Sequence, residues 1–200
     1  MKNLIAHRGL KDESKENTLQ AFTKSLENPN YQGFECDVRT SKDNVFVVCH
    51  DALIGISRVS STNYEQLKRK YNVPTLESVL KLQTDKIMLL EIKETNLDIE
   101  RFNKYAKKNI YIMSFFNTVI QKLYEKKCPC KLGVLNYVLN SEENYQEYQF
   151  ICLLESIVSK KLVNFFQEKN MEVFIYGIHH FKETQENYQD CYLITDEIIK

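Results

Sequence analysis

The sequence lacks an excess of either charge, a long apolar run, and any internal repeat or low-complexity linker. Its 27 basic and 27 acidic residues cancel, so no strongly basic field exists to attract nucleic acid or an anionic membrane. No apolar run approaches the length of a bilayer-spanning helix, and no basic amphipathic helix with an aromatic face is evident, which argues against stable membrane insertion. We expect the 200 residues to form a single domain, 1–200.

Two further features bear on the cellular compartment. The first motif begins at residue 7, which leaves no space for a secretory signal before it, so we expect a cytoplasmic protein. The pair Cys128-Pro129-Cys130 lacks the two-residue spacing that is usual for zinc, and the remaining cysteines lie inside apolar runs. We therefore expect all six cysteines to be reduced thiols.

Apolar strand-like runs recur along the whole chain, and helix-like segments separate most of them. Alternating strands and helices require parallel strands, and eight such units favour a closed (β/α)8 TIM barrel, an α/β fold, over an open sheet. A length near 200 residues implies a compact barrel with short connections. The predicted strands are 3–7, 33–38 with a continuation at 45–49, 86–92, 109–114, 131–136, 149–154, 172–177 and 191–194.

Local signals mark several helix ends. Thr62 with Glu65 predicts a capping box, and Thr75, which follows a proline, predicts a second N-cap. Asn170 is suited to the left-handed position that ends a helix. The segment 138–148 shows little apolar face and predicts a degenerate helix.

Charged residues stand at the ends of the predicted strands. In a barrel of this kind the carboxyl ends of the strands meet at one mouth, so residues that are distant in the sequence become neighbours there. Residues two apart on a strand share a face, which places Glu35 with Asp37 and Glu91 with Lys93. The sequence thus predicts three carboxylates at the mouth.

Three carboxylates packed together would repel one another unless a cation lies among them. All-oxygen ligands suit a divalent metal of the hard type, Mg²⁺ or Ca²⁺, with positions left for water and substrate. For any one acid alone, a structural ion pair such as Glu91 with Lys93 would be the simpler interpretation. For the set of three, the metal site is favoured.

Two histidines, His7 and His50, also stand at strand ends and can exchange protons near neutral pH. A pair beside a carboxylate site favours a catalytic role, in which one accepts a proton and the other donates. Arg8 and Lys93 add positive charge, which indicates an anionic substrate such as a phosphate ester. His179 and His180 lack comparable partners in the sequence, and we expect them on the surface.

Short motifs follow one another in a fixed order along nearly the whole chain. The motifs are His7-Arg8-Gly9, Glu16-Asn17-Thr18, Glu35-Cys36-Asp37-Val38, Val47-Val48-Cys49-His50-Asp51, Val73-Pro74-Thr75-Leu76-Glu77, Leu90-Glu91-Ile92-Lys93, Ser114-Phe115 and Ile194-Thr195-Asp196. Each motif alone is weak, whereas the series is a strong signal. This ordered series resembles the glycerophosphodiester phosphodiesterase family, whose barrel is related to phosphatidylinositol-specific phospholipase C.

The resemblance implies a metal-dependent hydrolysis of small glycerophosphodiesters to glycerol 3-phosphate and an alcohol. It implies that the three carboxylates bind the divalent metal, that the two histidines serve as general acid and base, and that Asn17 and Phe115 shape the substrate mouth. In the implied site, the metal ligands are Glu35, Asp37 and Glu91, and the catalytic residues are His7 and His50. The substrate-binding residues are Arg8, Lys93, Asn17 and Phe115. The nucleophile is either water or a hydroxyl of the substrate, which would pass through a cyclic phosphate.

The chain departs from the family pattern in two places. Only residues 52–73 stand where family members carry an insertion of several dozen residues after the second strand, and Ser57-Arg58 is the most that survives of its signature. Tyr176-Gly177-Ile178 replaces a tryptophan-containing motif, and the chain has no tryptophan. For Tyr176, as for most strand aromatics, we expect a core position.

Two alternatives stay open beside the phosphodiesterase. One is a phospholipase-D-like or cyclising activity on lysophospholipids, which the shortened and more open mouth would suit. The other is a non-catalytic barrel that binds a phosphodiester, although the presence of both histidines and all three carboxylates argues against it. The head group, the choice between Mg²⁺ and Ca²⁺, the assignment of acid and base, and the oligomeric state stay open as well.

Overall fold

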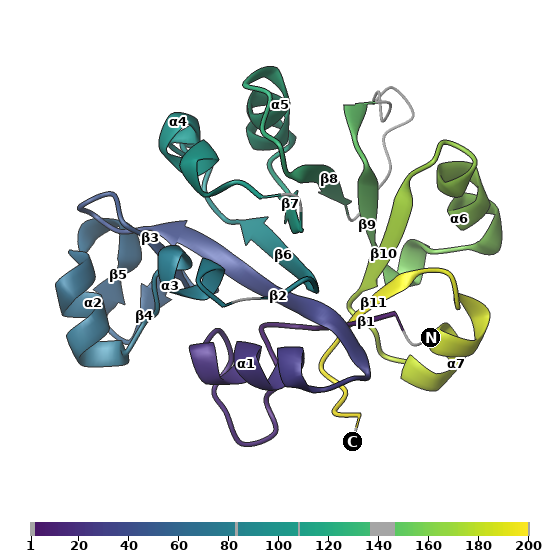
Figure 1. Ribbon diagram of the computed structural model, residues 1–200, viewed down its shortest axis with the longest axis horizontal. Helices are drawn as coiled ribbons and strands as arrows, with labels where there is room; N and C mark the ends of the chain where they lie inside the picture. The colour runs from purple at the N-terminus through teal and green to yellow at the C-terminus, as the bar shows by residue number, and fades with distance from the viewer. Residues whose placement is uncertain (1–2, 83, 108, 137–146, 200) are drawn as a thin grey trace.

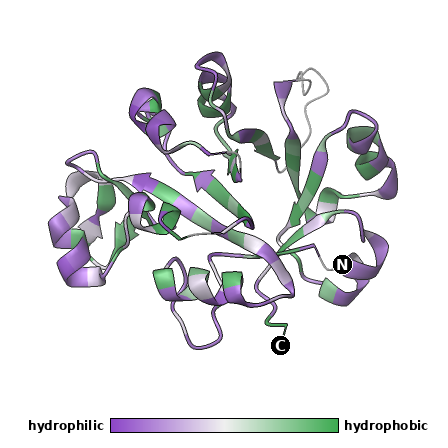
Figure 2. Cartoon of the chain, viewed as in Figure 1, coloured by the Kyte–Doolittle hydropathy of each residue, from purple (hydrophilic) through white to green (hydrophobic). Residues whose placement is uncertain are grey.

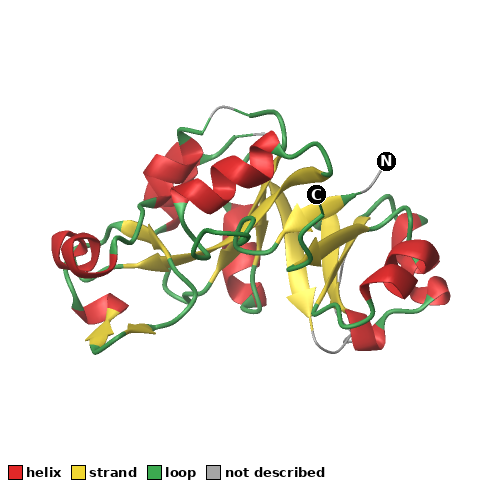
Figure 3. Cartoon of the chain, turned by 90° about the horizontal axis from the view of Figure 1, so that it is seen from below, coloured by secondary structure: helices red, strands yellow, loops and turns green. Residues whose placement is uncertain are grey.

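Strands lie at the centre of the molecule and helices surround them (Figures 1 and 3). The computed structural model describes residues 3–82, 84–107, 109–136 and 147–199. The degenerate helix expected at 138–148 falls largely outside the described residues. The strands are β1 (Leu4–Ala6), β2 (Tyr31–Thr40), β3 (Phe46–Val48), β4 (Leu53–Ile54), β5 (Ser57–Arg58), β6 (Ile87–Ile92), β7 (Ile110–Met113), β8 (Lys131–Asn136), β9 (Phe150–Leu154), β10 (Glu172–Tyr176) and β11 (Tyr192–Thr195). The α-helices are α1 (Leu19–Glu27), α2 (Tyr64–Tyr71), α3 (Leu76–Leu80), α4 (Ile99–Phe102), α5 (Asn117–Glu125), α6 (Lys160–Gln167) and α7 (Phe181–Asn187).

The central sheet closes on itself. Its nine strands run in the order β1-β11-β10-β9-β8-β7-β6-β2-β3, and β1 also pairs with β2. Every one of these pairs is parallel except β2 with β3. The ring therefore contains all the strands of the sheet except β3, which leaves eight parallel strands. The predicted (β/α)8 barrel is confirmed.

One predicted strand runs differently from the prediction. The segment 45–49 was expected to continue the second strand, but it forms β3, which turns back and pairs antiparallel with the end of β2, so that Val38 lies opposite Val48. The reversal passes through Asn44 at φ 61°. Asparagine tolerates this left-handed conformation better than most residues.

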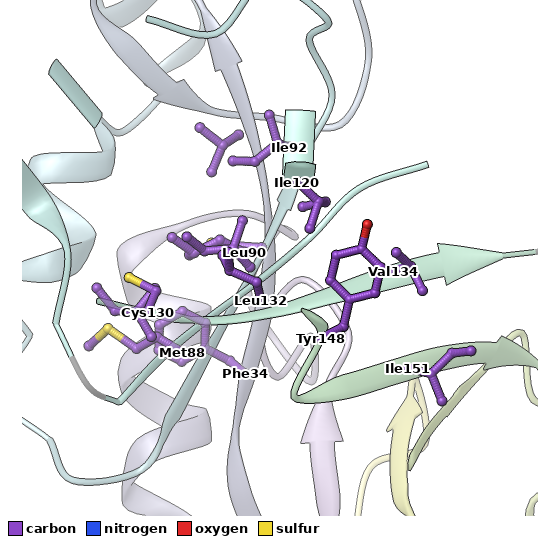
Figure 4. Close-up of a cluster of buried hydrophobic side chains, with 14 of the residues drawn as sticks. Phe34, Met88, Leu90, Ile92, Ile120, Cys130, Leu132, Val134, Tyr148 and Ile151 are labelled. Atoms are coloured by element: carbon purple, nitrogen blue, oxygen red, sulfur yellow. The ribbon is translucent and has the colours of Figure 1, made fainter. Parts of the chain in front are cut away.

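The described residues form three apolar clusters, and the two larger ones follow from the alternation of side chains along the strands. The outer core fills the space between the strands and the helices, where Leu90 and Ile92 of β6 lie near Ile120 of α5 (Figure 4). Figure 2 shows that β9 and β10 are mostly hydrophobic, whereas α2 is mostly hydrophilic. The inner core, inside the barrel, consists of Ile5, Leu89, Tyr111, Met113, Leu135, Phe150, Cys152, Phe174 and Ile194.

The helix caps confirm some of the local signals and correct one. Thr75 caps α3 and accepts a hydrogen bond from the backbone of Ser78 at 3.1 Å, and Asn170 has φ 60°. The capping box predicted at Thr62 is wrong, because the N-cap of α2 is Asn63, whose side chain makes no capping hydrogen bond. The carboxylate of Asp43, from the β2–β3 turn, accepts from the first helical N–H at 2.9 Å instead. A tertiary contact thus replaced the local cap.

The segment after β3 is short. The β4–β5 hairpin and α2 occupy residues 53–71, at one end of the molecule in Figure 1. Leu53 and Ile56 of this hairpin are 58% and 93% exposed. Among the described residues, no helix has the length and apolar character needed to cross a bilayer.

Candidate active site

The three acidic residues predicted to meet at the barrel mouth lie together on β2 and β6. The parallel register sets Asp37 opposite Glu91, and Glu35 lies two residues earlier on the same face of β2. Their carboxylates each offer an oxygen within 4.8 Å of the others. Cys36, between the two acids of β2, packs into the outer core instead. The strand alternation alone therefore turns both acids toward the mouth.

Two cations neutralise part of this charge. The ammonium of Lys93 lies 3.1 Å from Asp37 Oδ1 and 2.5 Å from Glu91 Oε1, so the ion pair considered as the simpler alternative is formed. Burial tends to raise the pKa of Asp37, but Lys93, the side chain of Asn17 and Arg8 together lower it. Burial raises the pKa of Glu91, with Lys93 opposing this shift and Asp37 adding to it. Asp37 is thus the carboxylate best stabilised in its charged form.

Glu35 is the acid that lacks a cationic partner of this kind. Burial, and then the charges of Asp37 and Glu91, raise its pKa well above the usual value. Its Oε2 accepts a hydrogen bond from the backbone N–H of Arg8 at 3.0 Å, whereas Oε1 is buried without a hydrogen-bond partner among the described residues. A buried carboxylate is stable when it is protonated or when it meets a cation. Three convergent carboxylates with an oxygen still unsatisfied fit a hard divalent metal ion.

Each of the two predicted histidines is held by a carboxylate through Nδ1. His7 Nδ1 lies 2.9 Å from Asp196 Oδ1, and His50 Nδ1 lies 2.8 Å from Asp51 Oδ1. A carboxylate at Nδ1 favours the proton on that nitrogen and leaves Nε2 available for exchange. Nε2 of His7 lies 4.0 Å from Glu35 Oε2, so this ring adjoins the carboxylate cluster.

The loop after β1 supplies backbone as well as side chains to the site. Arg8, Gly9 and Asn17 all have positive φ, at 55°, 83° and 55°. Glycine suits position 9 for two reasons. It adopts the positive φ without strain, and any Cβ there would lie 2.7 Å from the Cβ of Ala21 on α1. The amide of Asn17 donates to Asp37 Oδ2 at 2.8 Å. Asn17, predicted to meet the substrate, is therefore occupied in holding a carboxylate of the cluster.

A cavity of about 450 Å³ opens at the mouth. Phe115 lies in its wall beside Tyr176, with ring centroids 6.2 Å apart and planes at 72°. The expected core position of Tyr176 is met only in part, because the ring packs on the inner core and also lines the cavity. His179 is exposed, as expected, but lines the same cavity. The lining residues are His7, Arg8, His50, Glu91, Lys93, Phe115, Tyr176, Gly177, Ile178, His179, Ile194, Thr195 and Asp196.

Sequence reasoning gave no role to several of these lining residues. Asp196 holds His7, and the backbone N–H of His179 donates to Glu155 at 2.9 Å, which fixes the loop after β10. The available signal was position, since each residue follows the carboxyl end of a predicted strand, where barrel enzymes place their sites.

Residues 7–141 match the sequence profile of the glycerophosphoryl diester phosphodiesterase family. The chain belongs to this family. A glycerophosphodiester phosphodiesterase of Caldanaerobacter subterraneus is 31% identical over 165 residues, which cover 68% of this chain and 67% of that protein. One of Bacillus altitudinis is 31% identical over 119 residues, 51% of this chain and 48% of that protein.

Solved structures agree with the family assignment. The glycerophosphodiester phosphodiesterase of Parabacteroides distasonis superimposes with a TM-score of 0.81 at 25% identity, over 97% of this chain and 92% of that chain. A phosphodiesterase of Oleispira antarctica, solved with the product sn-glycerol-3-phosphate, has a TM-score of 0.80 at 19% identity, over 96% and 91% of the two chains. Membership of this family makes the chain a phosphoric diester hydrolase of the glycerophosphodiester phosphodiesterase class.

Proposed function

We propose that the chain, acting as one barrel domain over residues 1–200, hydrolyses glycerophosphodiesters to glycerol 3-phosphate and an alcohol in a reaction that depends on a divalent metal. One observation carries this proposal. Three buried carboxylates have oxygens within 4.8 Å of one another, and one of them, Glu91, lines a cavity that both strand-end histidines also line. The carboxylates that could hold a cation, the histidines that could exchange protons and the space for a small molecule therefore lie next to one another.

The metal ligands would be Glu35, Asp37 and Glu91. When bound there, Mg²⁺ or Ca²⁺ would supply positive charge to the phosphoryl oxygens of the substrate. The unsatisfied Oε1 of Glu35 and its raised pKa support this assignment, because both mark a place where positive charge is missing. The all-oxygen donor set supports these two ions over zinc.

His7 and His50 would transfer the protons. Asp196 and Asp51 orient the two rings, so that one Nε2 accepts the proton of the nucleophile while the other donates to the leaving alcohol. General acid–base catalysis of this kind contributes roughly 10²- to 10⁴-fold each. The remaining acceleration must come from electrostatic stabilisation and from positioning.

Arg8 and Lys93 would contact the phosphate. Both line the cavity, and Arg8 is aimed by Glu16, whose carboxylate lies 2.8 Å from its guanidinium. A guanidinium suits the paired oxygens of a phosphodiester. Phe115 would line the side of the cavity that receives the less polar part of the substrate.

The decisive assay is hydrolysis of glycerophosphocholine and glycerophosphoethanolamine by the purified protein in Mg²⁺, Ca²⁺ or EDTA. A coupled dehydrogenase detects glycerol 3-phosphate. Metal-dependent product is expected with at least one substrate. If only bis(p-nitrophenyl) phosphate is cleaved, the protein is a phosphodiesterase that acts on a different substrate. If none of the three compounds is cleaved, a binding protein is favoured.

A second candidate, a cyclising or phospholipase-D-like reaction on lysophospholipids, is favoured by one observation. Leu53 and Ile56 are 58% and 93% exposed on the hairpin, and a groove lined by that hairpin also contains His50. Exposed apolar side chains beside the site would suit an acyl chain. Phosphorus NMR of the products from lysophosphatidylcholine separates the possibilities, since cyclisation gives a cyclic phosphate that direct hydrolysis does not.

A further inference from the structure

By alternation along β2, Arg39 lies on the same side of the strand as Glu35 and Asp37. It lies opposite Val47 of β3, beyond the point where β2 leaves the barrel. Its side chain is only 15% exposed. A long cationic side chain that is mostly buried needs hydrogen-bond partners, and those of Arg39 are informative.

The guanidinium of Arg39 joins two segments of the active site. Its Nε donates to the backbone carbonyl of His50 at 2.8 Å. Its Nη1 donates to Glu94 Oε1 at 3.1 Å, and the Glu94 side chain is 20% exposed. Glu94 directly follows Lys93, so Arg39 links the peptide of one proposed catalytic residue to the loop that carries another.

His50 stands where strand pairing ends. The last β2–β3 pair is Val38 with Val48, and the N–H of Cys49 donates to the carbonyl of Asp37 at 3.0 Å. The ring of His50 is oriented by Asp51, which is the next residue and 74% exposed. A neighbour on the same loop cannot fix the position of that loop. The hydrogen bond from Arg39 connects the His50 peptide to the barrel.

We infer that Arg39 is a positioning residue: it holds the His50 backbone, with Glu94 fixing the guanidinium, and does not itself contact substrate. The inference rests on the proposed function insofar as His50 transfers a proton. A displacement of about 1 Å in a reacting group can cost about 10²-fold in rate, so loss of the Arg39 contact is expected to lower kcat by about 10- to 100-fold. KM and the affinity for metal should change little.

A double-mutant cycle tests this inference. The wild type, Arg39→Ala, His50→Ala and the double variant are compared on glycerophosphocholine, whose unactivated leaving alcohol makes kcat depend on His50 whether this residue is the acid or the base. Arg39→Ala should lower kcat in the wild type but cause little further loss once His50 is absent. Additive losses, or a rise in KM at unchanged kcat, would mean that Arg39 meets the substrate and would overturn the inference.

Three further variants separate positioning from folding. Arg39→Lys should restore part of kcat, since a lysine can still reach one of the two acceptors but lacks the planar fork. Glu94→Gln should give a smaller loss than Arg39→Ala, because the bond to the His50 carbonyl remains. Arg69→Ala, at an exposed arginine of α2, is the matched control and should leave kcat unchanged.

A spectroscopic measurement tests the inference independently of turnover. The chain has four histidines, so their ring resonances can be assigned by substitution. At one pH, Arg39→Ala should shift or broaden the His50 ring signals and leave those of His180 in place. Unchanged His50 signals would overturn the inference even if the protein proved to hydrolyse another substrate, and an inactive wild type with shifted signals would refute only the proposed function.

Discussion

Replacing Glu35 with glutamine is expected to stabilise the metal-free protein and to abolish its stabilisation by metal. Glu35 is 1% exposed, and its Oε1 has no hydrogen-bond partner among the described residues. Oxygens of Asp37 and Glu91 lie within 4.8 Å, where two like charges repel by about 3.5 kcal/mol at an effective dielectric constant of about 20. Lys93 and Arg8 offset part of this repulsion. A neutral amide of the same shape removes the remaining repulsion.

The magnitude follows from the usual cost of an unsatisfied buried polar group, about 1–3 kcal/mol. For a chain of this size, 1 kcal/mol shifts Tm by about 2–4 °C, so Glu35→Gln should raise Tm in EDTA by about 2–12 °C. Metal at about 100 times its Kd should stabilise the wild type by about 2.7 kcal/mol. Glu35→Gln, in which one of the three metal ligands is neutral, should gain little stability from the same metal concentration. The advantage of the variant should therefore shrink or reverse when metal is added.

The pH dependence has a defined sign. Because the pKa of Glu35 is raised, the folded metal-free protein keeps this proton to a higher pH than the unfolded chain does. The wild type therefore loses stability as the pH rises from about 4.3, the ordinary pKa of glutamate, through the raised pKa of the folded state. The advantage of Glu35→Gln in EDTA should grow over this range.

Thermal unfolding of both proteins in EDTA and in Mg²⁺, at several pH values, checks all three statements. Glu65→Gln, on the exposed face of α2, is a control that should respond to metal like the wild type. The reasoning fails if Glu35→Gln melts below the wild type in EDTA, or if Mg²⁺ stabilises both proteins equally.

Three further predictions follow from individual contacts. His7→Ala and His50→Ala should each lower kcat for glycerophosphocholine by about 10²- to 10⁴-fold while metal-induced stabilisation persists, and a kcat near that of the wild type would exclude the proton-transfer role. Burial tends to raise the pKa of Asp196, but hydrogen bonds and charge from His7 and Lys11 lower it overall. The contribution of Asp196 to folding stability should therefore be present above about pH 3.9 and fade below it. Urea titrations of Asp196→Asn should then approach the wild type as the pH falls, whereas a gap that widens would contradict the sign. Gly9→Ala should cost more than about 1 kcal/mol in urea unfolding, because φ is 83° and the new Cβ would lie 2.7 Å from Ala21 Cβ; a neutral result would show that α1 shifts freely.

Much of the barrel could be predicted because its strands are largely apolar runs bounded by turn and helix signals. The predictions at 86–92 and 131–136 match β6 (Ile87–Ile92) and β8 (Lys131–Asn136) almost residue for residue. The segment 45–49 was placed as a strand correctly, but its direction was not. An apolar run carries no information about the direction in which it pairs, and here the turn at Asn44 reverses the chain.

The site was predictable to the extent that it follows the strand period. Glu35, Asp37 and Glu91 gather because alternation and register leave them no other face. Tyr176 could not be assigned in this way, because the same position at a strand end can pack on the core and line a cavity at once. The substrate contact of Asn17 stays a prediction, and the hydrogen bond from its amide to Asp37 is a contact that the strand period could not predict.

The sequence by itself determined the alternation of strands and helices, the closed barrel and the residues that face its mouth, because periodicity and strand-end position are local properties of the chain. The tertiary structure decided which charges pair, which groups stay unsatisfied and which residues hold the catalytic side chains. Arg39 meets the carbonyl of His50 and Asp43 caps α2 only because folding brings separate loops within hydrogen-bond distance. Distances of this kind depend on the packing of the whole chain, and no local pattern encodes them.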